Sequence, residues 1–239
     1  MSFKWACTMA PSPLAVRRIT LDIMKVREMK DSGLFWVQDE GNVTRGWAIV
    51  CGCADTPYYG GAFCFEVQFP DNYPFDPPVF TYITNDGRTR FNPNLYKNGK
   101  VCLSLLNTWK GEPWSGVQSL LSVLQCIQTA VIHHEPLVNE PAHPASGDPK
   151  HPDVAIYNRM IFQATLETAI LGCFKTPPAY MVPVHEQTRE WARKAIPTLI
   201  VKARELAKTY DGMIETVSFY SMITTYRFEE LAILLETAL

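Results

Sequence analysis

Long hydrophobic runs are absent from this sequence of 239 residues. A membrane-spanning helix needs roughly 20 consecutive apolar residues, and no stretch approaches that length. Residues 1–5 are not followed by the apolar core of a signal peptide. The chain also lacks a large excess of either charge, because its formal net charge is −2. This charge gives no general case for nucleic-acid binding. We therefore predict neither membrane nor nucleic acid among the partners of this chain.

Regular cysteine spacing is missing as well. Seven cysteines without a pattern, in a chain of this size, argue for reduced thiols and hence for the cytoplasm, the nucleus or both. Cys51 and Cys53 are too close and too isolated for half of a zinc site, and on a strand both would point to one face. His133, His134 and Glu135 are residue types that bind metals, but the spacing indicates no further ligand that would complete a site. We predict no metal site.

The sequence has the composition of a globular protein, with 47% hydrophobic and 19% charged residues. An apolar periodicity predicts a helix over residues 14–30. Short polar connections between the next apolar segments predict a four-stranded antiparallel meander with a stiff Pro-rich loop at 70–78. The four predicted strands are Leu34–Val37, Gly46–Cys51, Ala62–Phe69 and Val79–Ile83.

Helical patterns dominate the second half of the chain. Apolar residues at helical spacing predict helices over 117–132, 154–171, 184–208 and 213–237. Pro197 is expected to kink the third of these or to begin a new helix. The fold class is therefore α+β.

The stretch from Asn92 to Leu106 joins the two halves. Its Asn98-Gly99 pair predicts a tight turn that folds Cys102 back towards Asn94. A thiol beside an amide donor suits acyl transfer. The alternative is a buried cysteine that acts only as a small hydrophobe.

A cysteine hydrolase is another possibility for the same thiol. It would pair Cys102 with His133 or His134, and it requires an imidazole within hydrogen-bond reach of the sulfur. No hydrolase signature surrounds Cys102.

Several linked motifs in this order resemble the ubiquitin-conjugating (E2) family. They are Pro57-Tyr58-x-Gly60-Gly61-x-Phe63, Phe69-Pro70-x-x-Tyr73-Pro74-Phe75-x-Pro77-Pro78, Asn92-Pro93-Asn94 with Cys102-Leu103, Trp114-Ser115, and Glu135-Pro136-Leu137-Val138-Asn139-Glu140-Pro141. The resemblance implies an E2 (UBC-like) core over residues 14–172. An N-terminal tail (1–13) and a C-terminal helical extension (173–239) flank that core.

The sequence departs from the family pattern at informative positions. Asn92 stands where the family usually has histidine, and Glu135 stands where many members have aspartate. The segment from Asn107 to Pro113 is slightly longer than usual. Three runs are similar to the E2 domains of very large hybrid enzymes that combine E2 and ligase roles: Asn92-Pro93-Asn94-Leu95-Tyr96, Leu106-Asn107-Thr108-Trp109 and Glu135-Pro136-x-x-Asn139-Glu140-Pro141. The extra C-terminal helices also fit that subgroup better than a minimal E2.

The resemblance implies that Cys102 carries ubiquitin as a thioester, received from an E1 and passed to a substrate lysine or a ligase. This role requires an accessible thiol. Asn94 is the expected oxyanion donor, with loop support as its alternative or additional role. Glu135 is expected to position the attacking lysine, although it could be only a helix-end carboxylate. Asn92 is expected to support the loop, since an amide cannot act as a general base.

The resemblance also implies partners: ubiquitin, an E1, an E3 of RING or similar type, and protein substrates. The residues expected to face E1 and E3 are Arg17, Arg18, Pro74, Phe75, Ser115 and Val117. No cofactor is expected, because ATP is used by the upstream E1. Two alternatives remain within the fold, a non-catalytic ubiquitin-binding variant and an E2 for another ubiquitin-like modifier.

Overall fold

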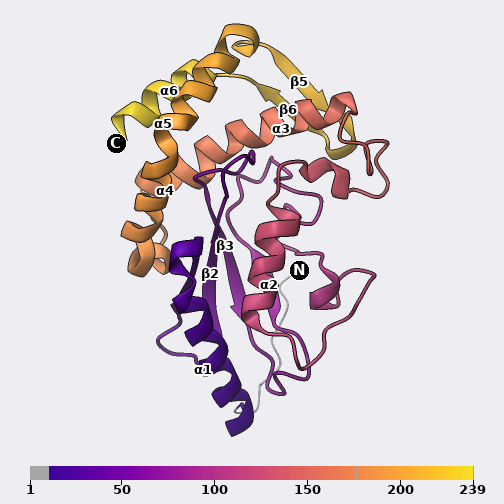
Figure 1. The fold of residues 1–239 in the computed structure, drawn as a ribbon, viewed down its shortest axis with the longest axis vertical. Coiled ribbons are helices and arrows are strands. Elements are labelled where there is room, and N and C mark those ends of the chain that lie inside the picture. Colours follow the sequence, from indigo (N-terminus) through magenta and orange to yellow (C-terminus); the bar gives the residue numbers. More distant parts are fainter. Residues whose placement is uncertain (1–10, 176, 239) are drawn as a thin grey trace.

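The computed structural model describes residues 11–175 and 177–238 (Figure 1). Cys7 and most of the predicted N-terminal tail lie outside this range. The described chain forms a four-stranded sheet with helices on both faces and a helical layer across one end, where α3 lies (Figure 1).

The sheet is the predicted antiparallel meander. Its strands are β1 (Leu34–Gln38), β2 (Arg45–Cys51), β3 (Ala62–Gln68) and β4 (Val79–Tyr82), and they pair in sequence order. Alternation of side chains gives each face its own core. One face packs under the helices α1 (Pro13–Glu28) and α2 (Leu120–Cys126), and the other packs under side chains from residues 173–191.

Helix α1 (Pro13–Glu28) begins where the side chain of Ser12 accepts a hydrogen bond from the Ala15 N–H, at 3.1 Å. Its buried face includes Ile19 and Ile23. Its outer face carries cations and also three exposed apolar side chains, which are Leu14, Leu21 and Met24.

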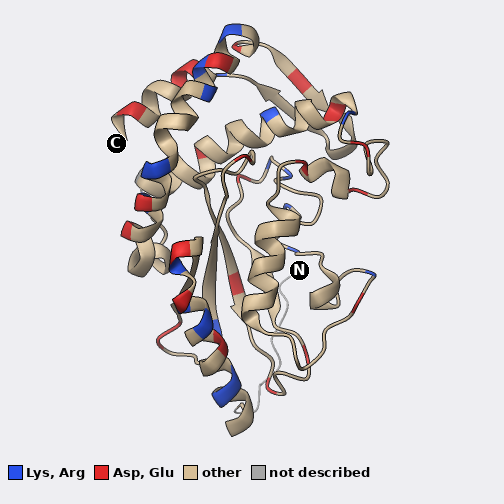
Figure 2. Cartoon of the chain, in the orientation of Figure 1, with Lys and Arg blue, Asp and Glu red and all other residues tan. Residues whose placement is uncertain are grey.

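Helix α2 (Leu120–Cys126) is shorter than the predicted helix 117–132. Ser119 and Ser122 form a reciprocal capping box that fixes its start, so the predicted first turn is wrong. A wider π turn, Ile127–Val131, continues it. The side chains of α2 carry no charge (Figure 2), which suits a helix packed on the core.

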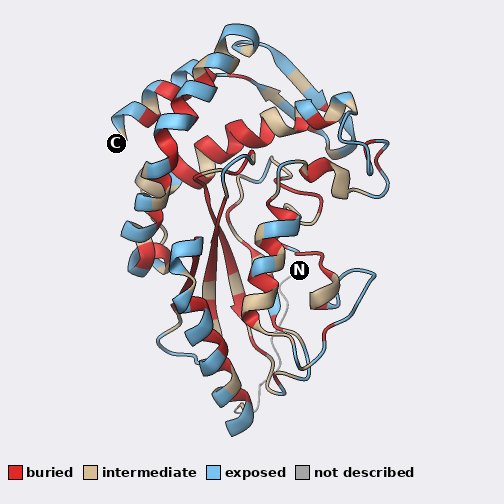
Figure 3. Cartoon of the chain, in the orientation of Figure 1, coloured by how far each residue is buried: buried red, intermediate tan, exposed pale blue. Residues whose placement is uncertain are grey.

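Helix α3 (Pro152–Ala164) covers one end of the sheet and is largely buried itself (Figure 3). A π segment, Thr165–Leu171, and the short helix α4 (Gly172–Lys175) prolong it. Helix α5 (His185–Tyr210) runs through Pro197 without a break and packs against α6 (Phe228–Thr237).

The predicted helix 213–237 is wrong over its first half. Residues there form a hairpin of β5 (Ile214–Val217) and β6 (Met222–Thr225) before α6 begins. The segment is rich in β-branched residues, and its burial alternates, with Val217 and Met222 inward and Ile214 and Ile223 outward. Burial that alternates from residue to residue, as in a strand, therefore describes this segment, and the helical apolar pattern does not.

The sheet face opposite α1 and α2 is closed by residues 173–191. Met181 and Val184 pack against the apolar side chains of that face, and the rings of Trp47 and Tyr180 stack at 5.7 Å. Among the described residues, no helix combines the length and the apolar character that a membrane crossing requires.

Candidate functional site

A small hairpin leads directly into Cys102. Leu95 bridges Val101, and the Tyr96 N–H donates to the Lys100 carbonyl at 2.9 Å. The turn is closed by Gly99, whose φ of 90° lies in the left-handed region. A side chain at Gly99 would also meet Thr81 at 2.9 Å, so glycine is required there.

The hairpin brings Cys102 and Asn94 together, as the turn predicts. The Cys102 N–H donates to the Asn94 carbonyl at 2.9 Å, and Asn94 Nδ2 donates to the Cys102 carbonyl at 2.7 Å. The Oδ1 atom of Asn94 is buried and has no hydrogen-bond partner among the described residues. The Asn94 side chain therefore braces the cysteine backbone in this state.

Cys102 is nearly buried, since only 2% of the residue is exposed. The expectation of an accessible thiol is wrong for this conformation. A nucleophilic role for this thiol would therefore require a local opening of the residues around the sulfur.

Asn92 ties this loop to the end of the α2 segment. It is fully buried, its Nδ2 donates to the Val131 carbonyl at 2.7 Å, and its Oδ1 accepts from the Asn94 N–H at 2.7 Å. Both bonds lie in the interior, where losing one partner leaves the other unsatisfied.

Arg90 is a residue that the sequence analysis missed. Its Nε donates to the Asn92 carbonyl at 3.1 Å, and its Nη2 donates to the Pro93 carbonyl at 2.6 Å. Its guanidinium also lies 3.4 Å from the ring centroid of Tyr96 and 5.3 Å from that of Tyr220. Tyr220 belongs to the turn between β5 and β6, so the C-terminal hairpin braces the loop that carries Asn94.

If Cys102 carries a thioester, as the resemblance implies, Tyr220→Ala should slow its discharge to lysine by about fivefold, because one cation–π contact is worth about 1 kcal/mol. Tyr220→Phe should discharge near the wild-type rate, since it retains the ring over Arg90. The control Ile223→Ala removes an exposed side chain from the outer face of the same hairpin. Single-turnover discharge measures the effect, and equal rates for Tyr220→Ala and the control would contradict it.

Glu135 lies just before a 3₁₀ turn, Pro136–Asn139. Its carboxylate is 29% exposed and lies 3.7 Å from Nε2 of His134. No hydrogen bond joins this carboxylate to the rest of the described chain.

The histidines are placed differently from a hydrolase base. Burial lowers the pKa of His133, whose Nδ1 accepts from the Glu135 N–H at 3.3 Å. Among the described residues, no hydrogen bond joins His133 or His134 to the sulfur of Cys102, so nothing supports the hydrolase alternative. In residues 11–175 and 177–238, no group of three or more His, Cys, Asp or Glu side chains is arranged to hold a metal ion.

The other thiols described are poor nucleophiles. Burial raises the pKa of the Cys173 thiol to about 11, and it also raises the pKa values of Cys51, Cys53, Cys64 and Cys126. A raised pKa leaves little thiolate at neutral pH, so these thiols are weaker candidates for a nucleophile. Cys51 and Cys64 lie in the core, whereas Cys53, Cys126 and Cys173 are only partly buried.

The predicted partner-facing loops meet on one surface. Trp114 Nε1 donates to the Pro74 carbonyl at 2.8 Å and so links the Pro-rich loop to the segment before α2. Phe75 is 69% exposed and Val117 is 91% exposed, and Ser115 is exposed beside them. Val117 is thus a surface residue and not part of the apolar face of a helix.

The two adjacent arginines of α1, Arg17 and Arg18, differ. Arg17 is exposed, but Arg18 is turned inward. Its guanidinium binds Asp22 at 3.1 Å and the carbonyls of Gly116 and Gln118 at 3.0 and 2.5 Å. The structure therefore gives Arg18 an internal role, instead of the predicted partner-facing one.

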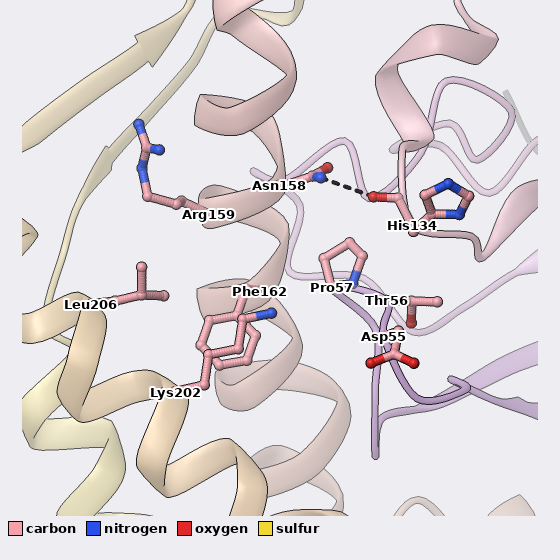
Figure 4. Close-up of a pocket in the computed structure, with 9 residues that line it drawn as sticks. All are labelled: Asp55, Thr56, Pro57, His134, Asn158, Arg159, Phe162, Lys202 and Leu206. Carbon is pink, nitrogen blue, oxygen red and sulfur yellow. Dashed lines mark hydrogen bonds between the residues drawn. The ribbon is translucent and has the colours of Figure 1, made fainter. Parts of the chain in front are cut away.

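A separate hollow of about 140 Å³ lies between α3, α5 and the turn at residues 55–57 (Figure 4). Asn158 Nδ2 donates to the His134 carbonyl at its edge, at 2.9 Å. Burial lowers the pKa of Lys202, which lies over the Phe162 ring. Neither Cys102 nor Asn94 lines this hollow.

A family model described as "Ubiquitin-conjugating enzyme" matches residues 18–167, which is more than half of the chain. The chain belongs to the ubiquitin-conjugating (E2) family. The match includes the loop of Cys102, the Pro-rich loop and Glu135, so the motif-based prediction of the family is confirmed.

Curated relatives agree with this assignment. Human "Ubiquitin-conjugating enzyme E2 Z" is 41% identical over 164 residues, which are 66% of this chain and 44% of the relative. Human "Dual E2 ubiquitin-conjugating enzyme/E3 ubiquitin-protein ligase BIRC6" is 40% identical over 163 residues, 65% of this chain and 3% of the relative. The predicted similarity to hybrid E2/E3 enzymes is confirmed. The chain spans less than half the length of these relatives.

An E2 domain of a Toxoplasma gondii ubiquitin-conjugating enzyme has a similar fold, with a TM-score of 0.51 and 22% identity. The similarity covers 64% of this chain and 97% of that domain. The predicted UBC-like fold is therefore confirmed, and the 14–172 boundary of the core stays a prediction.

Proposed function

We propose that this E2-family chain carries ubiquitin as a thioester on Cys102 and transfers it to a substrate lysine or to a ligase. The reciprocal hydrogen bonds between Cys102 and Asn94 carry this proposal most directly. They hold the backbone of Cys102 at the end of the hairpin, beside an amide that can reorganise towards an oxyanion.

In loading, the Cys102 thiolate attacks the thioester carbonyl of ubiquitin bound to an E1 cysteine. A new thioester forms on Cys102, and the E1 cysteine leaves as a thiolate, so the exchange consumes no ATP at this chain. The E1 has already used ATP to activate the ubiquitin carboxyl group. No cofactor takes part in the exchange.

In discharge, an uncharged lysine amine attacks the Cys102 thioester and a tetrahedral oxyanion forms. The Asn94 amide can donate to that oxyanion once it releases the Cys102 carbonyl. Glu135 can hold the lysine and accept its proton, and Asn92 keeps the loop in place through Val131. The oxyanion then collapses: the bond from the carbonyl carbon to Cys102 Sγ breaks, Cys102 leaves as a thiolate, and an isopeptide bond to the lysine remains.

We expect Glu135→Gln to slow discharge to lysine about tenfold, because a positioned carboxylate assists deprotonation of the amine. Lysine titration under single-turnover conditions measures the loss. Glu112→Gln, in an exposed loop, is the matched control. Equal discharge by both variants would leave Glu135 as a helix-end carboxylate.

Two alternatives share the fold. A non-catalytic ubiquitin-binding variant would form no adduct, and an E2 for another ubiquitin-like modifier would accept that modifier from a different E1. Incubation with a panel of E1 and modifier pairs and ATP distinguishes them. The proposal expects an adduct with ubiquitin that is lost in Cys102→Ala, whereas no adduct, or one that persists in this variant, contradicts it.

The proposed partners follow from the same role. Arg17, Phe75, Ser115 and Val117 offer an exposed surface for E1 and for an E3 of RING or similar type. The six described cysteines are free thiols, which supports the cytoplasm or nucleus as the compartment.

A further inference from the structure

The segment that contains Cys102 carries charge of one sign. Residues 87–111 have five cations and no carboxylate, whereas the whole chain has a formal net charge of −2. These cations are Arg88, Arg90, Lys97, Lys100 and Lys110. None of the five forms an ion pair within the described part of the chain.

The carboxylates near this segment are Asp86 and Glu112, which flank it in the sequence, and Glu140. Asp86 accepts hydrogen bonds from the N–H groups of Arg88 and Thr89, at 2.8 and 2.6 Å. Glu140 accepts one from the Tyr220 hydroxyl at 2.7 Å. These carboxylates keep their charge, but none of the three forms an ion pair with the five cations in the described part of the chain, so no direct ion pair neutralises the segment.

A hollow of about 300 Å³ lies beside the hairpin that leads into Cys102. It is lined by Arg90, Tyr96, Lys97, Asn98 and Tyr220, without any carboxylate. Arg90 is fixed by the carbonyls of Asn92 and Pro93, so its charge is held in place before any ligand arrives. Lys97 is half-buried at the turn and adds a second cation.

The hollow is within reach of the reacting centre. Lys97 precedes Cys102 by five residues, so their Cα atoms are at most about 18 Å apart, and the hairpin shortens that distance. A bound peptide covers the same distance with about five residues.

We propose that this hollow binds an acidic side chain of the acceptor protein, within about five residues of the lysine that attacks the Cys102 thioester. The inference rests on the proposed function of Cys102. Its physical basis is charge complementarity, because a fixed guanidinium and a lysine attract carboxylates and repel basic sequences. Acceptors whose lysine has acidic neighbours are the favoured substrates.

Discharge of preformed thioester to three peptides tests this inference. The peptides share one lysine and differ in the two residues that lie three and four positions away, which are Glu, Gln or Lys. At subsaturating peptide and low salt, the Glu peptide should react about fivefold faster than the Gln peptide, and the Lys peptide more slowly than both. The differences should shrink at about 0.5 M salt.

Lys97→Glu should reverse this order, and Lys97→Gln should weaken it. The control Lys194→Glu changes an exposed lysine of α5 and should keep the wild-type order. Equal rates for the three peptides, with normal discharge to free lysine, overturn the inference and leave the proposed function standing. Failure to form any Cys102 thioester contradicts the proposed function itself, and this inference with it.

Discussion

Asn94→Ala is expected to slow discharge of the Cys102 thioester to lysine by about 10²–10³-fold, the usual loss when an oxyanion donor is removed. Loading from E1 should fall much less. Both steps expel a thiolate, but they differ in the nucleophile. Loading uses a thiolate, which is a strong nucleophile, whereas attack by an amine depends more strongly on a stabilised tetrahedral oxyanion.

Asn94→Ala should have a second effect, because the Asn94 side chain also braces the backbone of Cys102. Its Nδ2 holds the Cys102 carbonyl at 2.7 Å, so the alanine variant also loosens the cysteine backbone. Single-turnover loading and discharge, measured on the same preparation, separate the two roles. Equal losses in both steps, or a large fall in the free energy of unfolding, would assign Asn94 to structure alone.

Asp22→Ala is expected to lower the free energy of unfolding by about 3–5 kcal/mol, the cost of breaking a buried charge pair. The Asp22 carboxylate is fully buried. It accepts hydrogen bonds from Arg18 Nε at 3.1 Å and from the Tyr73 hydroxyl, and its removal leaves both donors without their acceptor. The same carboxylate accepts a longer hydrogen bond from the Leu120 N–H at 3.4 Å, at the start of α2.

Urea unfolding measures this loss of stability. Asp31→Ala, at an exposed position after α1, should change stability by no more than about 0.5 kcal/mol. The double variant Arg18→Met with Asp22→Leu should recover part of the loss, because it removes both charges. A loss below about 1 kcal/mol for Asp22→Ala would show that this network is not a main contributor to stability.

The sheet and the loop of Cys102 were predictable because their signals are local. Alternating apolar residues and short polar turns specify the meander, and Asn98-Gly99 specifies the turn that joins Cys102 to Asn94. Of that pair, only Gly99 has a positive φ, so the turn rests on the glycine.

The features that sequence reasoning missed depend on contacts between distant segments. The inward orientation of Arg18 follows from carbonyls at Gly116 and Gln118, about a hundred residues away. The bracing of Arg90 by Tyr220 joins residues that no local pattern relates. The burial of Cys102 also depends on how separate segments pack around its loop.

The C-terminal hairpin shows a different reason for failure. Its residues fit a helical apolar pattern as well as a strand pattern, and short segments of this kind are ambiguous by periodicity alone. The ion pair between Arg159 of α3 and Glu215 of β5, at 2.5 Å, helps to select the strand. That contact could not be read from the sequence.

The chemistry of the adduct tests the central claim most directly. The chain and its Cys102→Ser variant are each incubated with E1, ATP and ubiquitin, and the products are analysed with and without a thiol reductant. The unaltered chain should carry ubiquitin on Cys102 as a thioester that the reductant removes. The variant should carry ubiquitin on the introduced serine hydroxyl as an oxyester that resists the reductant. A reductant-sensitive adduct that forms equally well in the variant would contradict the account.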